Sequence, residues 1–453
     1  MKILHYSLGF PPYRTGGLTK YCMDLMFSQK KRGHDVALLW PGQMGFICTK
    51  LSIRNNRVKD GIQSFEIINP LPVSLDEGIT DFKAYTANGE KGVYKKFLEE
   101  HKPDAIHIHT LMGLHKEFLI VAKEMDIKTV FTTHDYFGLC PTVTFFHNGH
   151  NYIDDFACVS CIKSNQLALS LNKIKLMQSP IYRLIKNTAT IKFMRRRHRK
   201  KFLDHKEMDA LEFLASEEEI EYKSNKYKEL RQHYIDMYGL INFFHFNSTI
   251  SEMVYKKYLQ PQYSSIISIT HNGISDHRKK KEFIGKLKIT YLSPTKPFKG
   301  FDVLKEALDE LWREGCRDFE LNIFNLTNDV GPYMNVQDGY QYSELEEIFN
   351  RTDILIAPSV CYETFGFTVI EALSYGVPVM VSNRAGVSDL ISNNINGLII
   401  NANVAGVKEA LITIIEEKKI LEKLNANIIK SNCIKSMDYH VNEMLDVYAL
   451  KKR

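Results

Sequence analysis

The sequence predicts an α/β protein made of two doubly wound, Rossmann-like domains, each built on a parallel sheet. Short apolar runs alternate with amphipathic stretches from the first residues onward, and a second series of the same kind starts near residue 287. Such alternation is typical of parallel strands joined by helices that cover both faces of the sheet. A length of 453 residues is enough for two domains that each bury a core.

The first domain is expected over residues 1–275. A loop and an amphipathic helix are predicted over 16–32. The alternation of strands and helices is interrupted at about 162–240, where Lys, Arg, Glu and Tyr are frequent. We expect long surface helices inserted there. Short apolar runs predict the strands of this domain at 2–6, 35–40, 105–109, 128–134 and 266–270.

The second domain is expected over residues 276–436, after a charged, turn-rich link at 274–286. Its first strand is predicted at 287–292 and another buried strand at 353–358. Residues 437–453 predict a closing helix. Open α/β sheets bind ligands at the carboxyl ends of their strands, so two such domains facing each other would place a site in a central cleft.

The composition is that of a soluble globular protein, with 44% hydrophobic and 25% charged residues. No apolar stretch approaches the roughly 18–20 residues that span a bilayer. The first residues are too few and too polar for a signal peptide. Eight scattered cysteines fit reduced thiols better than a disulfide framework. We therefore expect a cytoplasmic protein.

The net charge of +6 is small for this length, but basic residues gather in one dense run. That run contains Arg195, Arg196, Arg197, Arg199, Lys200 and Lys201. It is either a solvated helix face or a region attracted to an anionic membrane surface, where each basic residue contributes about 1 kcal/mol. The second alternative would place the protein peripherally on the inner face of the cytoplasmic membrane. Nucleic acid is not expected, because no RNA-binding or helix-turn-helix signature accompanies the run.

Two carboxylates, Glu363 and Glu371, flank a Phe-Gly turn between a predicted strand and a predicted helix. Glu363 lies in the loop, and Glu371 lies inside the helix, about one and a half turns beyond the helix start near Gly366 at roughly 1.5 Å per residue. The helix start near Gly366 offers unpaired backbone N–H groups to an anion. This arrangement suits a ligand that combines phosphate with hydroxyl groups, such as a nucleotide joined to a sugar.

The stretch from Glu363 to Pro378 resembles the Glu-(x)7-Glu motif of retaining glycosyltransferases, in particular family 4. The likeness includes the Phe-Gly pair, the Glu-Ala inside the helix and the Gly-Val-Pro-Val ending. It implies the GT-B fold, a UDP- or GDP-linked sugar as donor substrate, no cofactor, and a closing helix that returns to the first domain. It also implies a glycan or lipid-linked saccharide acceptor, as in the synthesis of bacterial surface polysaccharides.

The same resemblance implies roles for the residues of the motif. Glu363 would contact the sugar near the reacting centre, and Glu371 would accept hydrogen bonds from the ribose hydroxyls. Retention of configuration follows the family, and we favour a front-face reaction in which the leaving phosphate helps to deprotonate the acceptor. No Asp-x-Asp motif lies where the donor would sit, so no catalytic metal is expected. The backbone that would meet the sugar and the diphosphate belongs to Phe365, Gly366, Phe367 and Thr368.

Four residues of the first domain are further candidates. Gly16 and Gly17 let the backbone approach a ligand closely, and after the first strand they resemble the family's glycine-rich donor loop. His134 ends a predicted strand and matches the family's histidine near the donor sugar, where it would hydrogen-bond to the sugar rather than act as a general base. His109 ends the preceding strand and has either an acceptor-side or a structural role.

Lys299-Gly300 matches the Lys-Gly pair that holds the donor diphosphate in this family. An ammonium there would stabilise the leaving group as negative charge builds on it. The family usually has an arginine five residues earlier, and here that position is Pro294. Either Lys296 supplies the missing charge, or donor affinity depends on Lys299 alone.

A cysteine group offers a separate possibility. Cys158 and Cys161 form a Cys-x2-Cys pair, preceded by Cys140. With His147 and His150 between them, they are compatible with structural zinc. The spacing before the pair is irregular, so free thiols and redox pairing are the alternatives.

The leading hypothesis is a retaining, metal-independent hexosyltransferase. A nucleotide-sugar epimerase of the same fold would need its catalytic carboxylates in a different pattern. A catalytically silent relative that binds glycan or acts as a scaffold is supported only by the changed segment 293–295. The presence of Glu363, Glu371, Lys299 and His134 argues against it.

Overall fold

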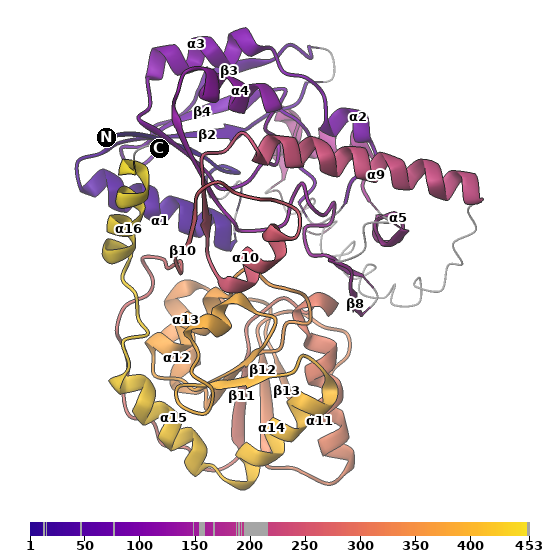
Figure 1. Ribbon diagram of the computed structural model, residues 1–453. Helices are drawn as coiled ribbons and strands as arrows, with labels where there is room; N and C mark the ends of the chain where they lie inside the picture. Colours follow the sequence, from indigo (N-terminus) through magenta and orange to yellow (C-terminus); the bar gives the residue numbers. More distant parts are fainter. Residues whose placement is uncertain are drawn as a thin grey trace.

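The computed structural model describes residues 1–11, 14, 16–45, 48–75, 78–147, 149–153, 159–165, 168–186, 188, 191, 193 and 216–450. Within these ranges the chain forms two sheet-and-helix halves, which lie one above the other in Figure 1. The basic run at 195–201 and Cys158 fall outside the described residues. No helix in the described part is both long and apolar enough to cross a membrane.

The first half is built on an eight-stranded sheet in the order β10-β9-β6-β5-β1-β2-β4-β3. All neighbouring pairs are parallel except β3 with β4. Most of these strands are short apolar segments buried on both faces, as a sheet covered by helices requires. Their bounds are β1 (Lys2–Tyr6), β2 (Asp35–Pro41), β3 (Ser52–Asn55), β4 (Gln63–Ile68), β5 (Ala105–Ile108), β6 (Lys128–Thr132), β9 (Phe243–Phe246) and β10 (Ser264–Ile266).

Helices and one small hairpin complete this half. They are α1 (Gly17–Lys31), α2 (Phe82–Tyr85), α3 (Lys91–His101), α4 (Lys116–Glu124), α5 (Val159–Ser164), α6 (Leu171–Met177), α7 (Pro180–Ile185), α9 (Glu217–Tyr238) and α10 (Thr249–Lys256), with the hairpin β7 (Phe146–His147) and β8 (His150–Asn151). The prediction that the helices of this region lie on the surface is partly wrong for α9. Its side chains Tyr227, Tyr234 and Tyr238 are buried in the main core, because each hydroxyl donates a hydrogen bond to a backbone carbonyl.

The second half has a six-stranded, all-parallel sheet in the order β13-β12-β11-β14-β15-β16. Its strands are β11 (Leu287–Tyr291), β12 (Phe319–Ile323), β13 (Met334–Val336), β14 (Ile354–Ala357), β15 (Val379–Ser382) and β16 (Leu398–Ile400). Its helices are α11 (Phe301–Arg313), α12 (Leu345–Asn350), α13 (Phe367–Ser374), α14 (Val404–Glu416) and α15 (Lys419–Lys430), with the 3-10 turns η2 (Pro297–Lys299), η3 (Tyr342–Glu344) and η4 (Gly386–Leu390). The doubly wound order was expected from the alternation of strands and helices.

The chain crosses between the halves twice, and the two crossings are joined by hydrogen bonds. The Thr270 hydroxyl donates to the Lys435 carbonyl at 2.8 Å, and the Lys435 ammonium donates to the Ser268 carbonyl at 3.2 Å. After the second crossing, α16 (Met437–Ala449) lies along α1 of the first half (Figure 1). The two ends of the chain therefore come close together.

One predicted strand is misplaced, and several strands, β9 among them, were missed. The run predicted at 266–270 forms a strand only at Ser264–Ile266, because its ladder to β9 ends where Ile267 donates to the Phe246 carbonyl. The next residues leave the sheet toward the second half. β9 was not predicted, although its sequence Phe-Phe-His-Phe is apolar apart from His245, which is fully buried.

Two glycines at the ends of α11 give a test of the local structure. Gly300 has φ 77°, and a Cβ there would lie 1.9 Å from the Pro358 carbonyl oxygen. Gly315 has φ 93°, but a Cβ there would meet nothing within 4 Å. Both positions favour glycine by conformation, and only Gly300 also needs the space.

We predict that Gly300→Ala lowers the free energy of unfolding more than Gly315→Ala does. Gly315→Ala, the control, adds only the strain of a left-handed backbone, about 1 kcal/mol. Gly300→Ala also forces β14 away from α11 and should lower the free energy of unfolding by about 3 kcal/mol. Urea unfolding of both variants measures the difference. Equal losses would contradict the close approach at Pro358.

Candidate active site

Glu363 lies in the loop between β14 and α13, where both of its carboxylate oxygens have partners. The Lys299 ammonium donates to Oε1 at 2.5 Å, and the Ser359 hydroxyl donates to Oε2 at 2.5 Å. Burial works to lower the pKa of Lys299, but the Glu363 carboxylate outweighs it and leaves that pKa above its usual value. The structure therefore joins the two motif residues predicted to handle sugar and diphosphate in one ion pair.

Glu371 lies inside α13 and is 2% exposed. Its Oε1 contacts His271 Nε2 at 2.9 Å, while Oε2 is buried without a hydrogen-bond partner in the described residues. Burial and the Glu371 carboxylate together raise the pKa of the Tyr342 phenol. A buried carboxylate oxygen without a partner costs about 1–3 kcal/mol, which a hydroxyl donor from a ligand would remove.

The start of α13 lies between these two carboxylates. Gly366 precedes the helix with φ 152°, and no side chain caps the first turn, which contains Phe367 and Thr368. Gly17 of the first half comes so close that a Cβ there would lie 3.0 Å from the Phe367 ring. The first-half glycines, of which Gly16 has φ 110°, thus meet the uncapped N-terminal end of α13. Phe365, beside them, is buried.

His134 follows β6 and reaches the same loop from the other half. Its backbone carbonyl accepts a hydrogen bond from the Thr364 hydroxyl at 2.9 Å. Its imidazole is partly exposed, contacts the Tyr21 ring with centroids 4.9 Å apart, and lies 3.3 Å from His109 through Nε2 and Nδ1. His109 itself is fully buried, so it has no surface for direct contact with a ligand, and His134 lies between it and the domain interface.

Lys296 lies three residues before Lys299, on the same short turn. Both ammonium groups face the Phe298 ring, at 5.5 Å for Lys296 and 5.9 Å for Lys299. Lys296 is exposed, and Pro294 contributes only its carbonyl, which accepts from the Tyr291 hydroxyl at 2.8 Å. A second cation is therefore near the position where the family's arginine is missing.

Several residues at the domain interface were not predicted. Asn247 is 1% exposed, and neither polar atom of its side chain has a partner in the described residues. Next to it, the Ser248 hydroxyl donates to the Thr364 carbonyl at 2.7 Å. Burial raises the pKa of Asp135 to about 6. Asn247 follows the carboxyl end of β9, so recognising that strand in the sequence would have revealed it.

The cysteine group does not assemble within the described residues. Cys140 accepts a hydrogen bond from the Phe145 N–H at 3.3 Å, and Cys161 lies 3.5 Å from the Arg231 guanidinium. Cys158 is outside the described residues, so zinc stays a prediction. In the described part, metal-ligating side chains approach one another in one group, formed by His5, His107 and His109. Each ring nitrogen of these histidines is within hydrogen-bonding distance of a polar atom.

Comparisons with known proteins agree on the family. Residues 15–160 match the model of Glycosyltransferase Family 4, and residues 334–431 match that of Glycosyl transferases group 1. Together these segments contain Gly16, Gly17 and His134 of the first half and the Glu363–Glu371 motif of the second.

Curated relatives align over parts of the chain. An uncharacterized glycosyltransferase of Methanocaldococcus jannaschii is 29% identical over 132 residues, which cover 28% of this chain and 33% of that protein. A phosphatidyl-myo-inositol mannosyltransferase of Propionibacterium freudenreichii is 28% identical over 154 residues, covering 32% of this chain and 39% of that protein. The alignments therefore span well under half of either relative.

Solved structures match along the whole chain. Sucrose-phosphate synthase from Thermosynechococcus elongatus superposes with a TM-score of 0.60 at 12% identity, covering 99% of this chain and 98% of that one. WaaG, a glycosyltransferase involved in lipopolysaccharide biosynthesis, gives 0.56 at 14% identity with 99% coverage of both chains. Anabaena HepE in complex with UDP-glucose gives 0.55 at 12% identity, covering 99% of this chain and all of that one. The chain has the GT-B fold and belongs to the glycosyltransferases that join a family 4 domain to a group 1 domain.

Proposed function

We propose that this protein transfers a sugar from a nucleotide-sugar donor to a glycan acceptor, with retention of configuration and without a catalytic metal. The observation that carries the proposal is the pair of carboxylates on either side of the uncapped start of α13, one paired with Lys299 and one with an unpaired oxygen. Phosphate suits the helix start, and hydroxyl groups suit the carboxylates.

The Lys299–Glu363 ion pair gives the site a way to respond to the donor. A diphosphate competes with Glu363 for the ammonium, because charge-assisted hydrogen bonds to phosphate are strong. Once Lys299 turns to the diphosphate, Glu363 is left to accept hydrogen bonds from sugar hydroxyls. Lys299 then supplies positive charge where the leaving group becomes more negative, the role that a divalent cation plays in other phosphate chemistry. Lys296 and the backbone N–H groups at the start of α13 would further stabilise the negative charge of the leaving group.

Glu371 defines the nucleotide end of the proposed site. Its Oε2 would accept from a ribose hydroxyl, while Oε1 stays on His271 of the interdomain crossing. Binding of the nucleotide would in this way affect the chain segment that joins the two halves, because His271 belongs to that segment. The nucleotide would be UDP or GDP. HepE, a structural neighbour, has been solved with UDP-glucose.

The proposed acceptor is a lipid-linked saccharide reached at an anionic membrane surface. Exposed apolar side chains of α6, α7 and the residues after them come immediately before the basic run in the sequence. They are Leu176 (51% exposed), Ile181 (67%), Leu184 (82%) and Phe193 (64%). Apolar side chains followed by arginines and lysines are the combination that binds an anionic bilayer interface.

We predict that Lys299→Ala and Glu371→Gln each weaken nucleotide binding by about 1–3 kcal/mol, the value of a lost charged hydrogen bond. Calorimetry with UDP and GDP as probes measures the loss. Lys305→Ala is the matched control, because Lys305 pairs with Asp309 on α11 and lies outside the proposed site. Unchanged affinity in both variants would rule out the proposed nucleotide position.

We predict a different result for Glu363→Gln. Release of nucleoside diphosphate should fall about 100-fold or more, because an interaction made in the transition state is lost. UDP or GDP affinity should stay equal or rise, since Lys299 no longer has a competing carboxylate. Ser359→Ala, which removes only the hydrogen bond to Oε2, should cost less. Equal losses in turnover and nucleotide affinity would argue against a sugar contact.

We predict that the protein sediments with anionic liposomes and is released as salt rises past about 0.15 M, where charges are screened over roughly 8 Å. Changing Ile181 and Leu184 to Ser should weaken sedimentation, and so should changing Arg195, Arg196, Arg197 and Arg199 to Ser. Ile395→Ser, at an exposed apolar residue of the other half, is the control. Binding that ignores salt or lipid charge would leave the basic run as a solvated face.

A further inference from the structure

A continuous series of polar side chains lies buried beneath His134, at the carboxyl ends of β1, β5, β6 and β9. Its members come from these strands and from α1 and α16: His5, Gln29, His107, His109, Thr132, His245 and Tyr448. All are 4% exposed or less. Successive members lie 2.6–3.3 Å apart through one polar atom each, and the series ends on the Ile267 carbonyl at the first interdomain crossing.

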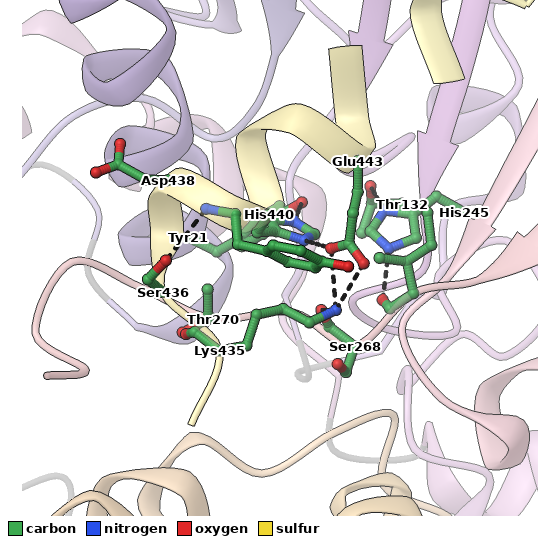
Figure 2. A network of polar contacts seen from close by, with 12 residues as sticks. Tyr21, Thr132, His245, Ser268, Thr270, Lys435, Ser436, Asp438, His440 and Glu443 are labelled. Atoms are coloured by element: carbon green, nitrogen blue, oxygen red, sulfur yellow. Dashed lines mark hydrogen bonds and ion pairs between the residues drawn. The ribbon is translucent and has the colours of Figure 1, made fainter. Parts of the chain in front are cut away.

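The carbonyl end fixes the direction of the first hydrogen bonds. The Ile267 oxygen only accepts, so His245 Nε2 carries the proton and donates to it at 2.7 Å. In a neutral imidazole the other nitrogen accepts, so the Thr132 hydroxyl donates to His245 Nδ1 at 2.8 Å. That uses the only hydroxyl proton of Thr132. His107 Nε2 therefore donates to Thr132 at 2.6 Å. Figure 2 shows Thr132 and His245 at this end of the series.

The same reasoning continues through the two helices. His107 Nδ1 must accept, so the Tyr448 hydroxyl donates to it at 2.6 Å. The Tyr448 oxygen then accepts from the Gln29 amide nitrogen at 3.2 Å. The Gln29 carbonyl oxygen in turn accepts from His5 Nε2 at 2.8 Å.

The last links lead to the domain interface. With its proton on Nε2, His5 accepts at Nδ1 from His109 Nε2 at 3.0 Å. His109 therefore accepts at Nδ1 from His134 Nε2 at 3.3 Å. Every link has one solution, provided that the histidines are neutral. Desolvation favours this neutral state, because it lowers the pKa of His5 to about 4 and that of the partly exposed His134 to about 3, and lowers those of the buried His107, His109 and His245.

We propose that this buried series fixes His134 in the tautomer with its proton on Nε2, so that Nδ1 offers a lone pair at the domain interface. Among the described residues, Nδ1 of His134 has no hydrogen-bond partner. His109, His5, Gln29 and Tyr448 are then positioning residues, which act on a ligand only through His134. The same bonds occupy the nitrogens of His5, His107 and His109, so a metal ion there would have to break several of them.

The fixed tautomer has a consequence for recognition, which rests on the proposed function. An unprotonated Nδ1 accepts a hydrogen bond from a sugar hydroxyl and repels a phosphate oxygen. His134 would therefore select the sugar part of the donor and leave the diphosphate to Lys299 and α13. Because Tyr448 belongs to α16, the closing helix takes part in setting the hydrogen-bonding character of a side chain at the interface.

A second network beside the series provides the control. Tyr21, whose ring contacts His134, lies 2.7 Å from His440 Nε2 through its hydroxyl, and His440 Nδ1 lies 3.2 Å from Glu443. Glu443 is paired with Lys435 at 2.9 Å (Figure 2). The Tyr21 hydroxyl thus belongs to the contacts of α16 with the second crossing. It also interacts with Thr132, but none of the links between Thr132 and His134 passes through it.

The experiment is two-bond ¹H–¹⁵N correlation NMR on the ligand-free, full-length protein with ¹⁵N-labelled histidine, which distinguishes the two tautomers. His134 is assigned by comparison with His134→Gln. We expect the Nε2–H tautomer in the wild type at pH 7. An Nδ1–H or doubly protonated His134 would overturn the proposal. This measurement needs no donor, so its result is independent of the proposed function.

Two variants test the cause of the preference. His109→Phe keeps a ring of similar size but removes the acceptor for His134 Nε2–H, so His134 should populate both tautomers. Tyr21→Phe should leave the tautomer unchanged. An unchanged His134 in folded His109→Phe would show that the series does not set it. Added UDP-glucose, compared with UDP alone, should shift His134 Nδ1 upfield; equal shifts with the two probes would overturn the sugar contact and leave the tautomer standing.

Discussion

The carboxyl ends of two parallel sheets have to meet, and the proposed site depends on the hydrogen bonds that hold them there. Thr364 contacts the first half twice, through its hydroxyl to the His134 carbonyl and through its carbonyl to the Ser248 hydroxyl. These bonds fix the loop that carries Glu363, and they bring it to His134. The Gly17–Phe367 approach adds a steric limit, since a Cβ at Gly17 would lie 3.0 Å from the Phe367 ring and the ring would have to shift.

A few charged side chains surround that contact. Lys299 is matched by Glu363, and Glu371 keeps one oxygen for His271 and one without a partner. Opposite them, the first half contributes neutral imidazoles, whose burial disfavours the charged form. One half therefore supplies ions suited to a diphosphate and to hydroxyl groups, and the other supplies a polar but uncharged wall.

Much of the fold could be predicted because apolar periodicity reports burial directly. The strands at Lys2–Tyr6, Leu287–Tyr291 and Ile354–Ala357 and the helix at Met437–Ala449 lie within or close to their expected ranges. Prediction failed at buried segments whose residues are not all hydrophobic. The strand Phe243–Phe246 contains a buried histidine, and α9 buries tyrosines whose hydroxyls find backbone partners only in the folded protein.

The sequence by itself determined the two-domain α/β architecture, the family and the order of the motif from Glu363 to Glu371, because each depends on residues close together in the chain. Only the tertiary structure decided what those side chains face. The pairing of Lys299 with Glu363 spans 64 positions, and that of His107 with Tyr448 spans 341. Hydrogen-bond direction is set by atoms from many elements at once, so no local pattern contains it.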